Sequence, residues 1–128
     1  MIQEEILDGN KLIAEFMGWT QQLDVRERWY GAWFDQHRVR KAWPKGHEPL
    51  LFHESWDWLM PVVEKIESIV FDENNSFNVT IGSSNYCVIQ DSNGEVYEFI
   101  EDYKESKLLT TYSAVVNFIK WYNENKKT

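Results

Sequence analysis

The chain has 128 residues, of which 43% are hydrophobic and 16% aromatic, and it carries a formal net charge of −8. A chain of this length buries a core of its own, and its composition excludes an intrinsically disordered protein. No apolar run approaches the roughly 20 residues of a transmembrane helix, and the acidic start shows no secretory signal. Cys87 is the only cysteine, so no internal disulfide is expected, which fits a reducing, intracellular setting.

The first element that the sequence predicts is a short helix over residues 11–18. Asp8 or Asn10 is suited to cap its first N–H groups, and Gly18 is suited to a left-handed exit. At two to three turns such a helix is marginal alone and needs a surface to dock on.

An aromatic insert follows at about residues 19–53, in what we expect to be a single domain over residues 1–128. Residues 27–34 and 38–43 are typical of two strands of a hairpin around residues 35–37. In this hairpin the spacing of Trp29 and Trp33 places both rings on one face.

The clearest helical pattern covers residues 55–70, with Ser55 as the expected N-cap. Pro61 lies inside this segment and predicts a kink or a loose first turn. The residues that recur on one face of this helix are Trp56, Leu59, Val63, Ile66 and Val70.

Three strands are predicted next, at residues 76–81, 86–89 and 96–100, joined by turns too short for crossovers. A second main helix is expected from Ser106 to about Asn123. The sequence therefore predicts an α+β fold, in which an antiparallel meander of three or more strands packs with two main helices and the short N-terminal helix.

Residues 10–18, 55–67 and 116–123 resemble the phage ABA sandwich domain family, with the block Trp58-Leu59-Met60-Pro61-Val62-Val63-Glu64-Lys65-Ile66 as the most distinctive part. That family consists of small uncharacterised proteins of phages, prophages and their bacterial hosts. The resemblance implies a sandwich-like α/β arrangement and a mobile-element origin. We expect the protein in the cytoplasm of a bacterial host cell. The resemblance implies no activity and no functional residues, and the aromatic insert departs from the family pattern.

The first candidate site is an interaction surface on the insert, where cations and aromatic rings alternate. Its residues are Trp29, Tyr30, Trp33, Trp43, Arg38 and Arg40. Interfaces favour Trp, Tyr and Arg, so we expect at least one of these tryptophans to contact a protein partner or a second copy. The alternative is that the rings belong to the core and the arginines to a solvated face.

The second candidate site is an acidic surface. Residues 54–106 carry 12 acidic and 2 basic side chains, a balance that disfavours nucleic acid as a partner. The candidate residues are Asp72, Glu73, Asp91, Glu95, Glu98, Glu101, Asp102 and Glu105. They could imitate DNA phosphates and occupy a host nucleic-acid-handling protein, or they could serve solubility alone.

An enzyme or a metal protein is the third hypothesis, and it would use His37, His47 and His53. Their spacing matches no zinc pattern, and Cys87 on a predicted strand is typical of a small core residue. We expect no catalytic residue, metal or cofactor. The favoured function is a small non-enzymatic protein-binding or adaptor module, and the alternative is an acidic inhibitor.

Overall fold

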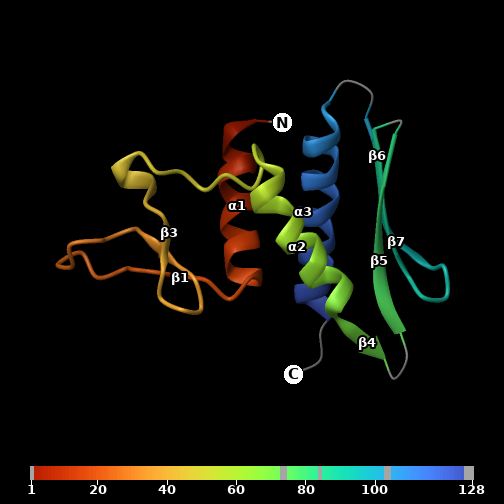
Figure 1. The fold of residues 1–128 in the computed structure, drawn as a ribbon, viewed down its shortest axis with the longest axis horizontal. Helices are drawn as coiled ribbons and strands as arrows, with labels where there is room; N and C mark the ends of the chain where they lie inside the picture. The colour runs from red at the N-terminus through yellow and green to blue at the C-terminus, as the bar shows by residue number, and fades with distance from the viewer. Residues whose placement is uncertain (1, 73–74, 84, 103–104, 126–128) are drawn as a thin grey trace. The chain divides into compact units, whose positions relative to one another are not determined.

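The computed structural model describes residues 2–72, 75–83, 85–102 and 105–125. Its helices and antiparallel sheets confirm the α+β class (Figure 1). The chain forms two compact units, an N-terminal unit over Met1–Leu51 and a C-terminal unit over Phe52–Thr128. The expectation of one domain with an insert at 19–53 stays a prediction, although the boundary between the units falls near the end of that insert.

The N-terminal unit begins with helix α1 (Gln3–Phe16). This helix starts well before the predicted residue 11, and its N-cap is Ile2 rather than Asp8 or Asn10. The side-chain amide of the buried Asn10 instead donates to the backbone oxygen of Leu50 (3.3 Å). The predicted left-handed exit at Gly18 is confirmed, because its φ is 81°.

The rest of the N-terminal unit is a small antiparallel sheet with long turns. Its strands are β1 (Thr20–Gln21), β2 (Trp33–Phe34) and β3 (Arg40–Ala42), in the order β1-β2-β3. The 3-10 helix η1 (Pro44–Gly46) follows β3. The predicted hairpin exists between β2 and β3, but its first strand is two residues long, so the prediction of a strand from residue 27 is wrong.

The C-terminal unit opens with helix α2 (Trp56–Ser68), which runs on past Pro61. The backbone oxygen of Ser55 accepts from the N–H groups of Trp58 and Leu59, so the predicted start is confirmed. The predicted end is wrong, because Val70 is exposed and belongs to the next strand. The helix buries Leu59, Val62, Val63 and Ile66.

A four-stranded antiparallel sheet follows, in the order β4-β5-β6-β7. Its strands are β4 (Val70–Asp72), β5 (Asn75–Gly82), β6 (Tyr86–Asp91) and β7 (Val96–Glu101). The last three are the predicted meander. The predicted turn before β7 is also confirmed, because Gly94 has a φ of 84° and the N–H of Asp91 donates to the oxygen of Glu95 (2.9 Å).

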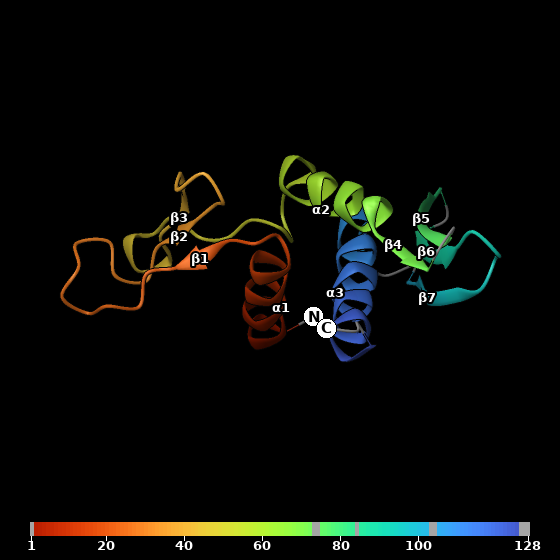
Figure 2. The same cartoon turned by 90° about the horizontal axis from the view of Figure 1, so that it is seen from below.

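Helix α3 (Lys107–Asn125) completes the unit. The N–H of Leu109 donates to Ser106 Oγ (3.1 Å), so the predicted cap is confirmed. Helix α3 packs on β6 and β7, and α2 packs on β5. Figure 2 shows both helices on one side of the sheet, so its other face is open within the C-terminal unit.

Aromatic side chains join the two layers of this unit. The ring of Phe77 on β5 lies 4.8 Å from that of Phe118 on α3 and 5.3 Å from that of Tyr97 on β7. Tyr97 in turn lies 4.6 Å from Trp121. Aromatic pairs at these distances add to the stabilisation that burial of the rings already provides. The Phe77–Phe118 and Tyr97–Trp121 pairs hold the sheet on α3.

Candidate functional site

A basic–aromatic cluster, which consists of Trp29, Tyr30, Arg40, Trp43 and Lys45, organises the N-terminal unit. The guanidinium carbon of Arg40 lies 4.0 Å from the ring centre of Trp29, and the Trp29 and Trp43 rings meet edge-to-face at 4.9 Å. The ammonium of Lys45 lies 3.5 Å from the ring centre of Tyr30. Desolvated contacts between a cation and a ring are worth about 2 kcal/mol, against about 0.5–1 at exposed sites, so the cluster stabilises a unit with little regular structure.

Two further contacts fix the geometry of this cluster. Trp43 Nε1 donates to the backbone oxygen of Tyr30 (2.9 Å), and Arg40 pairs with Glu48 (3.0 Å). The ring of Trp43 also covers Gly46, where a Cβ would collide with it. Position 46 therefore needs glycine so that the ring of Trp43 can pack flat on the backbone.

The cluster corrects two expectations about the tryptophans. Trp33 is buried with 4% exposure, so it belongs to the core of the N-terminal unit and not to an interaction surface. Trp29 lies in a turn and not on a strand, so the expected shared face with Trp33 does not form. Trp29 and Trp43 are half-buried, and their rings are in contact with each other and with Arg40.

The expected residue Arg38 stands apart from the cluster, in the turn between β2 and β3. Asp35 Oδ1 accepts from the N–H groups of His37 (2.8 Å) and Val39 (3.0 Å), and Arg38 has a φ of 63°. The pKa of the Asp35 carboxyl is lowered, mainly by the hydrogen bond from the N–H of Val39, although desolvation acts in the opposite direction. A left-handed arginine is uncommon, and this turn places its side chain beside Phe34.

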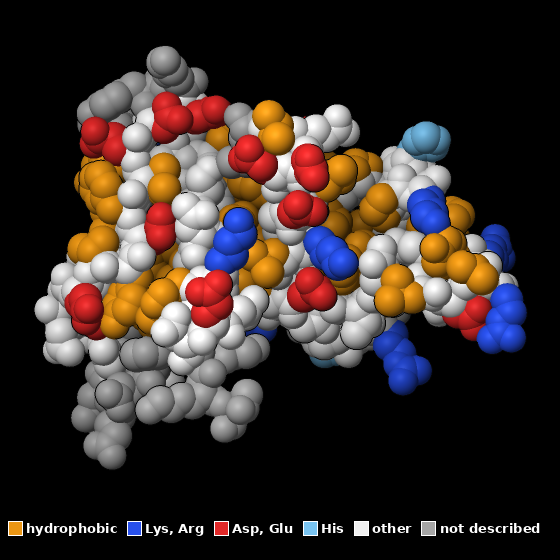
Figure 3. All heavy atoms as spheres, turned by 180° about the vertical axis from the view of Figure 1, so that it is seen from behind, with side chains coloured by type: hydrophobic (Ala, Val, Ile, Leu, Met, Phe, Trp, Pro, Cys, Tyr) orange, Lys and Arg blue, Asp and Glu red, His pale blue; other side chains and the backbone are white. Residues whose placement is uncertain are grey.

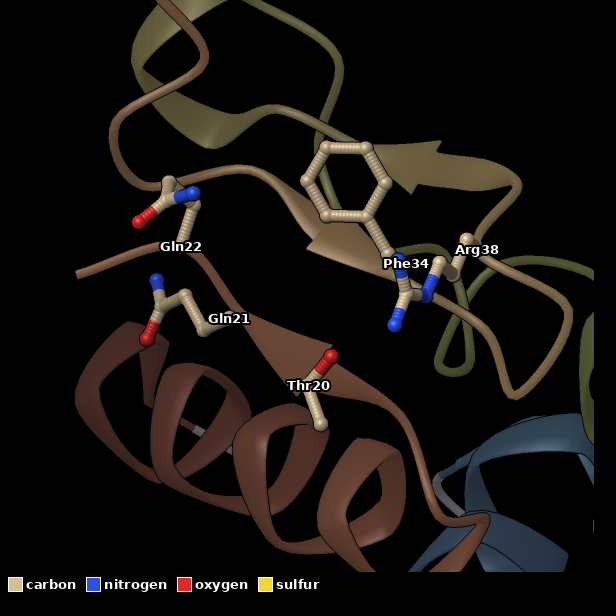
Figure 4. A pocket seen from close by; sticks show the side chains of 5 residues that line it. All are labelled: Thr20, Gln21, Gln22, Phe34 and Arg38. Carbon is tan, nitrogen blue, oxygen red and sulfur yellow. The ribbon is translucent and has the colours of Figure 1, made fainter. Parts of the chain in front are cut away.

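An open hollow of about 400 Å³ adjoins this turn, and Figure 4 shows the five side chains that line it. Phe34 and Arg38 come from the β2–β3 hairpin, and Thr20, Gln21 and Gln22 come from β1 and the residue after it. The hollow offers an aromatic ring, a guanidinium and amides to an approaching side chain.

Residues 22–26, which we call the aliphatic loop, continue from this hollow. They were not among the candidate sites predicted from the sequence. Leu23 and Val25 are each 71% exposed. Between them, the N–H of Asp24 donates to Gln22 Oε1 (3.0 Å). The carboxylate of Asp24 accepts from the N–H, Nε and Nη2 of Arg26 (each 3.0 Å). The alternation of apolar and polar residues from 22 to 26 is the signal that could have revealed the loop.

The aliphatic loop is also tied at its first residue to the segment that leads into β2. The N–H of Gly31 donates to the oxygen of Gln22 (2.7 Å), and the N–H of Gln22 donates to the oxygen of Ala32 (2.9 Å). Figure 3 shows Lys and Arg side chains with hydrophobic ones among them at the end of the N-terminal unit that carries β1 to β3. The loop thus carries two exposed apolar side chains on a backbone that hydrogen bonds to the side chains of Gln22 and Asp24 hold in place.

The expected acidic surface of the C-terminal unit is only partly formed. Asp91 is 3% exposed, so its assignment to a surface is wrong. Its carboxylate accepts from the Asn75 amide, the Tyr97 hydroxyl and the N–H groups of Asn93 and Glu95. Desolvation raises the pKa of Asp91, but these hydrogen bonds together outweigh it and hold the pKa below its ordinary value.

The other acidic residues have separate places. Glu98 is half-buried and accepts from the amide of Asn117 on α3 (3.2 Å). Glu95 and Glu101 are exposed at the two ends of β7, and Asp102 and Glu105 are half-buried just beyond it. Asp72 lies on β4, and Glu73 lies outside the described residues.

The three histidines lie in separate segments of the chain. His37 and His47 are exposed in two turns of the N-terminal unit, whereas His53 belongs to the C-terminal unit and contacts Glu54 (3.3 Å). Among the described residues, no group of His, Cys, Asp and Glu is arranged to hold a metal ion. Cys87 is fully buried, and desolvation raises the pKa of its thiol to about 12, which is the opposite of what a nucleophile needs.

Comparisons with known proteins returned no matching family model, curated protein or solved structure. In the part of the chain that the structure describes, no helix has the length and apolar character that a membrane crossing requires.

Proposed function

We propose that this protein is a small, non-enzymatic binding module whose N-terminal unit contacts a partner protein through the aliphatic loop. The observation that carries the proposal is the pair Leu23 and Val25, each 71% exposed on a backbone held by hydrogen bonds from Gln22 to Arg26. A braced loop loses little conformational freedom on binding, so burial of its apolar side chains goes largely into affinity.

The flanking cations favour a protein over a nucleic acid as the partner. Arg26 is paired with Asp24, and Arg40 is paired with Glu48. A cation that is already paired with a carboxylate contributes less free energy to the binding of a phosphate. The rings of Trp29 and Trp43 contact each other and Arg40, so they do not form the open stacking platform that single-stranded nucleic acids use.

The cellular setting is part of the same proposal. The resemblance of residues 10–18, 55–67 and 116–123 to the phage ABA sandwich domain family supports an origin in a phage or prophage. The single cysteine supports a place in the cytoplasm of the bacterial host. In this setting the module would act as an adaptor that joins or blocks a host or phage protein.

The test compares capture of partners from a bacterial lysate by the wild type and by a variant with both Leu23→Ser and Val25→Ser. The matched control is Leu7→Ser, which changes an exposed leucine on α1 of the same unit. We expect a partner that resists high salt and that the double variant loses while the control keeps it, because apolar contacts are not screened.

Two outcomes would contradict the proposal. Equal capture by the double variant would show that the aliphatic loop is not the contact. A partner that salt releases, and that Glu101→Lys also loses, would favour the acidic surface and an inhibitor of a nucleic-acid-handling protein.

A further inference from the structure

The edge strand β7 belongs to the C-terminal unit and is separate in the chain from the aliphatic loop. Among the described residues, β7 pairs with β6 alone, so its far edge is a free sheet edge. Figure 2 shows β7 at this edge, with the helices on one side of the sheet only. A free edge is a template for a further strand.

The register shows which backbone groups point away from β6. The N–H of Asp102 donates to the oxygen of Asn85 (3.2 Å), and Glu101 and Phe99 lie opposite Tyr86 and Val88. Because the pairs in an antiparallel ladder alternate, Asp102 belongs to a hydrogen-bonded pair and Glu101 and Phe99 do not. The N–H and C=O groups of Glu101 and Phe99 therefore point outward, where an added strand would meet them.

The side chains of β7 specify what such a strand must carry. Phe99 is 55% exposed and stacks on the ring of Tyr86 at 6.2 Å. From Glu98 to Glu101 the strand reads acidic, apolar, apolar, acidic. Hydrophobic and acidic side chains lie together over this sheet at the left of Figure 3. Cross-strand neighbours of opposite charge stabilise a pair and like charges destabilise it, so the complement is basic, apolar, apolar, basic.

The charge of this edge disfavours a second copy of this chain. Each copy carries a net charge of −8 and would bring the same carboxylates of Glu98 and Glu101 to the shared edge, and charges of the same sign repel. We infer that β7 binds an extended basic segment of a partner protein, which adds as an antiparallel fifth strand with a basic–apolar–apolar–basic sequence.

The experiment uses the full chain and two blocked peptides of about eight residues, one centred on Lys-Val-Val-Lys and the other on Glu-Val-Val-Glu. Amide hydrogen exchange is followed residue by residue by NMR. We expect the lysine peptide to bind and to slow exchange at Phe99 and Glu101, while the glutamate peptide does not bind. This protection distinguishes strand addition from loose attraction between charges.

A charge reversal provides the second arm. Glu101→Lys is expected to weaken the lysine peptide about fivefold and to let the glutamate peptide bind. The matched control Glu64→Lys makes the same charge change at an exposed position of α2 and should leave both affinities unchanged.

Three results would overturn the inference. Binding without protection of Phe99 and Glu101 would indicate a diffuse electrostatic contact. An equal loss with Glu64→Lys would indicate an effect of net charge alone. Protection of both amides without peptide, together with a dimer in light scattering, would make a second copy the occupant. Glu101→Lys changes β7 and leaves the aliphatic loop unchanged, so the two proposed surfaces are tested separately.

Discussion

Replacement of Leu59 by alanine tests the packing of helix α2 on the sheet. Leu59 is completely buried, whereas its neighbour Met60 is 37% exposed. The loss of roughly three buried carbon groups costs about 2.4 kcal/mol at about 0.8 kcal/mol each, and the residual cavity adds about 1–2 kcal/mol. Leu59→Ala should therefore lower the free energy of unfolding of the C-terminal unit by about 3.4–4.4 kcal/mol.

Urea unfolding followed by circular dichroism measures this loss, and Met60→Ala is the matched control on the same helix. The control should cost less than about 1 kcal/mol, because part of its side chain is already in water and alanine is a good helix former. The difference between the urea midpoints of the two variants then measures the contribution of the buried side chain. Equal effects of the two substitutions would show that α2 packs through another face.

Three further predictions follow from buried polar groups. Within the described residues the buried hydroxyl of Thr110 has no hydrogen-bond partner, so Thr110→Val should raise the free energy of unfolding by about 1 kcal/mol in the same urea assay; a loss would reveal a hidden partner. The pKa of Asp91 is lower in the folded chain, so its stabilisation is full above the unfolded pKa of about 4 and disappears as the pH falls through the folded value. Asp91→Asn should flatten melting temperature against pH below about 5, and an unchanged slope would refute this. Cys87, with its pKa raised to about 12, should react with a thiol reagent only after unfolding, and rapid labelling of the native chain would contradict its burial.

Strong periodicity made most of the C-terminal unit predictable. The alternation around Phe77, the Asn93-Gly94 turn and the Ser106 cap each have one dominant local solution, and the structure adopts all three. Strand β4 was not predicted, because Val70 continues the helical spacing of α2 although the helix ends at Ser68. Pairing with β5, which is a tertiary contact, decides this boundary.

The N-terminal unit was harder to predict because its regular elements are short. Two-residue strands such as Trp33–Phe34 have no period to detect. Helix α1 extends back through Gly9 and Asn10, two residues that usually end or cap a helix; both are buried there, and Asn10 bonds to the chain at Leu50. Contacts between distant residues override the local preferences.

The candidate sites show the same limit. The sequence shows that cations and rings alternate between Trp29 and Trp43, but it does not show that Trp33 is core or that Arg40 lies on Trp29. Asp91 looked like a surface carboxylate because a turn aspartate is usually solvated. Its hydrogen bonds to Asn75 and Tyr97 depend on side chains that the fold brings from other strands.

The most direct test of the central claim is the affinity of a salt-resistant captured partner for the wild type and for the variant with both Leu23→Ser and Val25→Ser. Burial of each exposed side chain contributes about 1 kcal/mol or more, so the double variant should bind about thirtyfold more weakly at equal stability. An affinity within about twofold of the wild type would contradict a role of the aliphatic loop in binding.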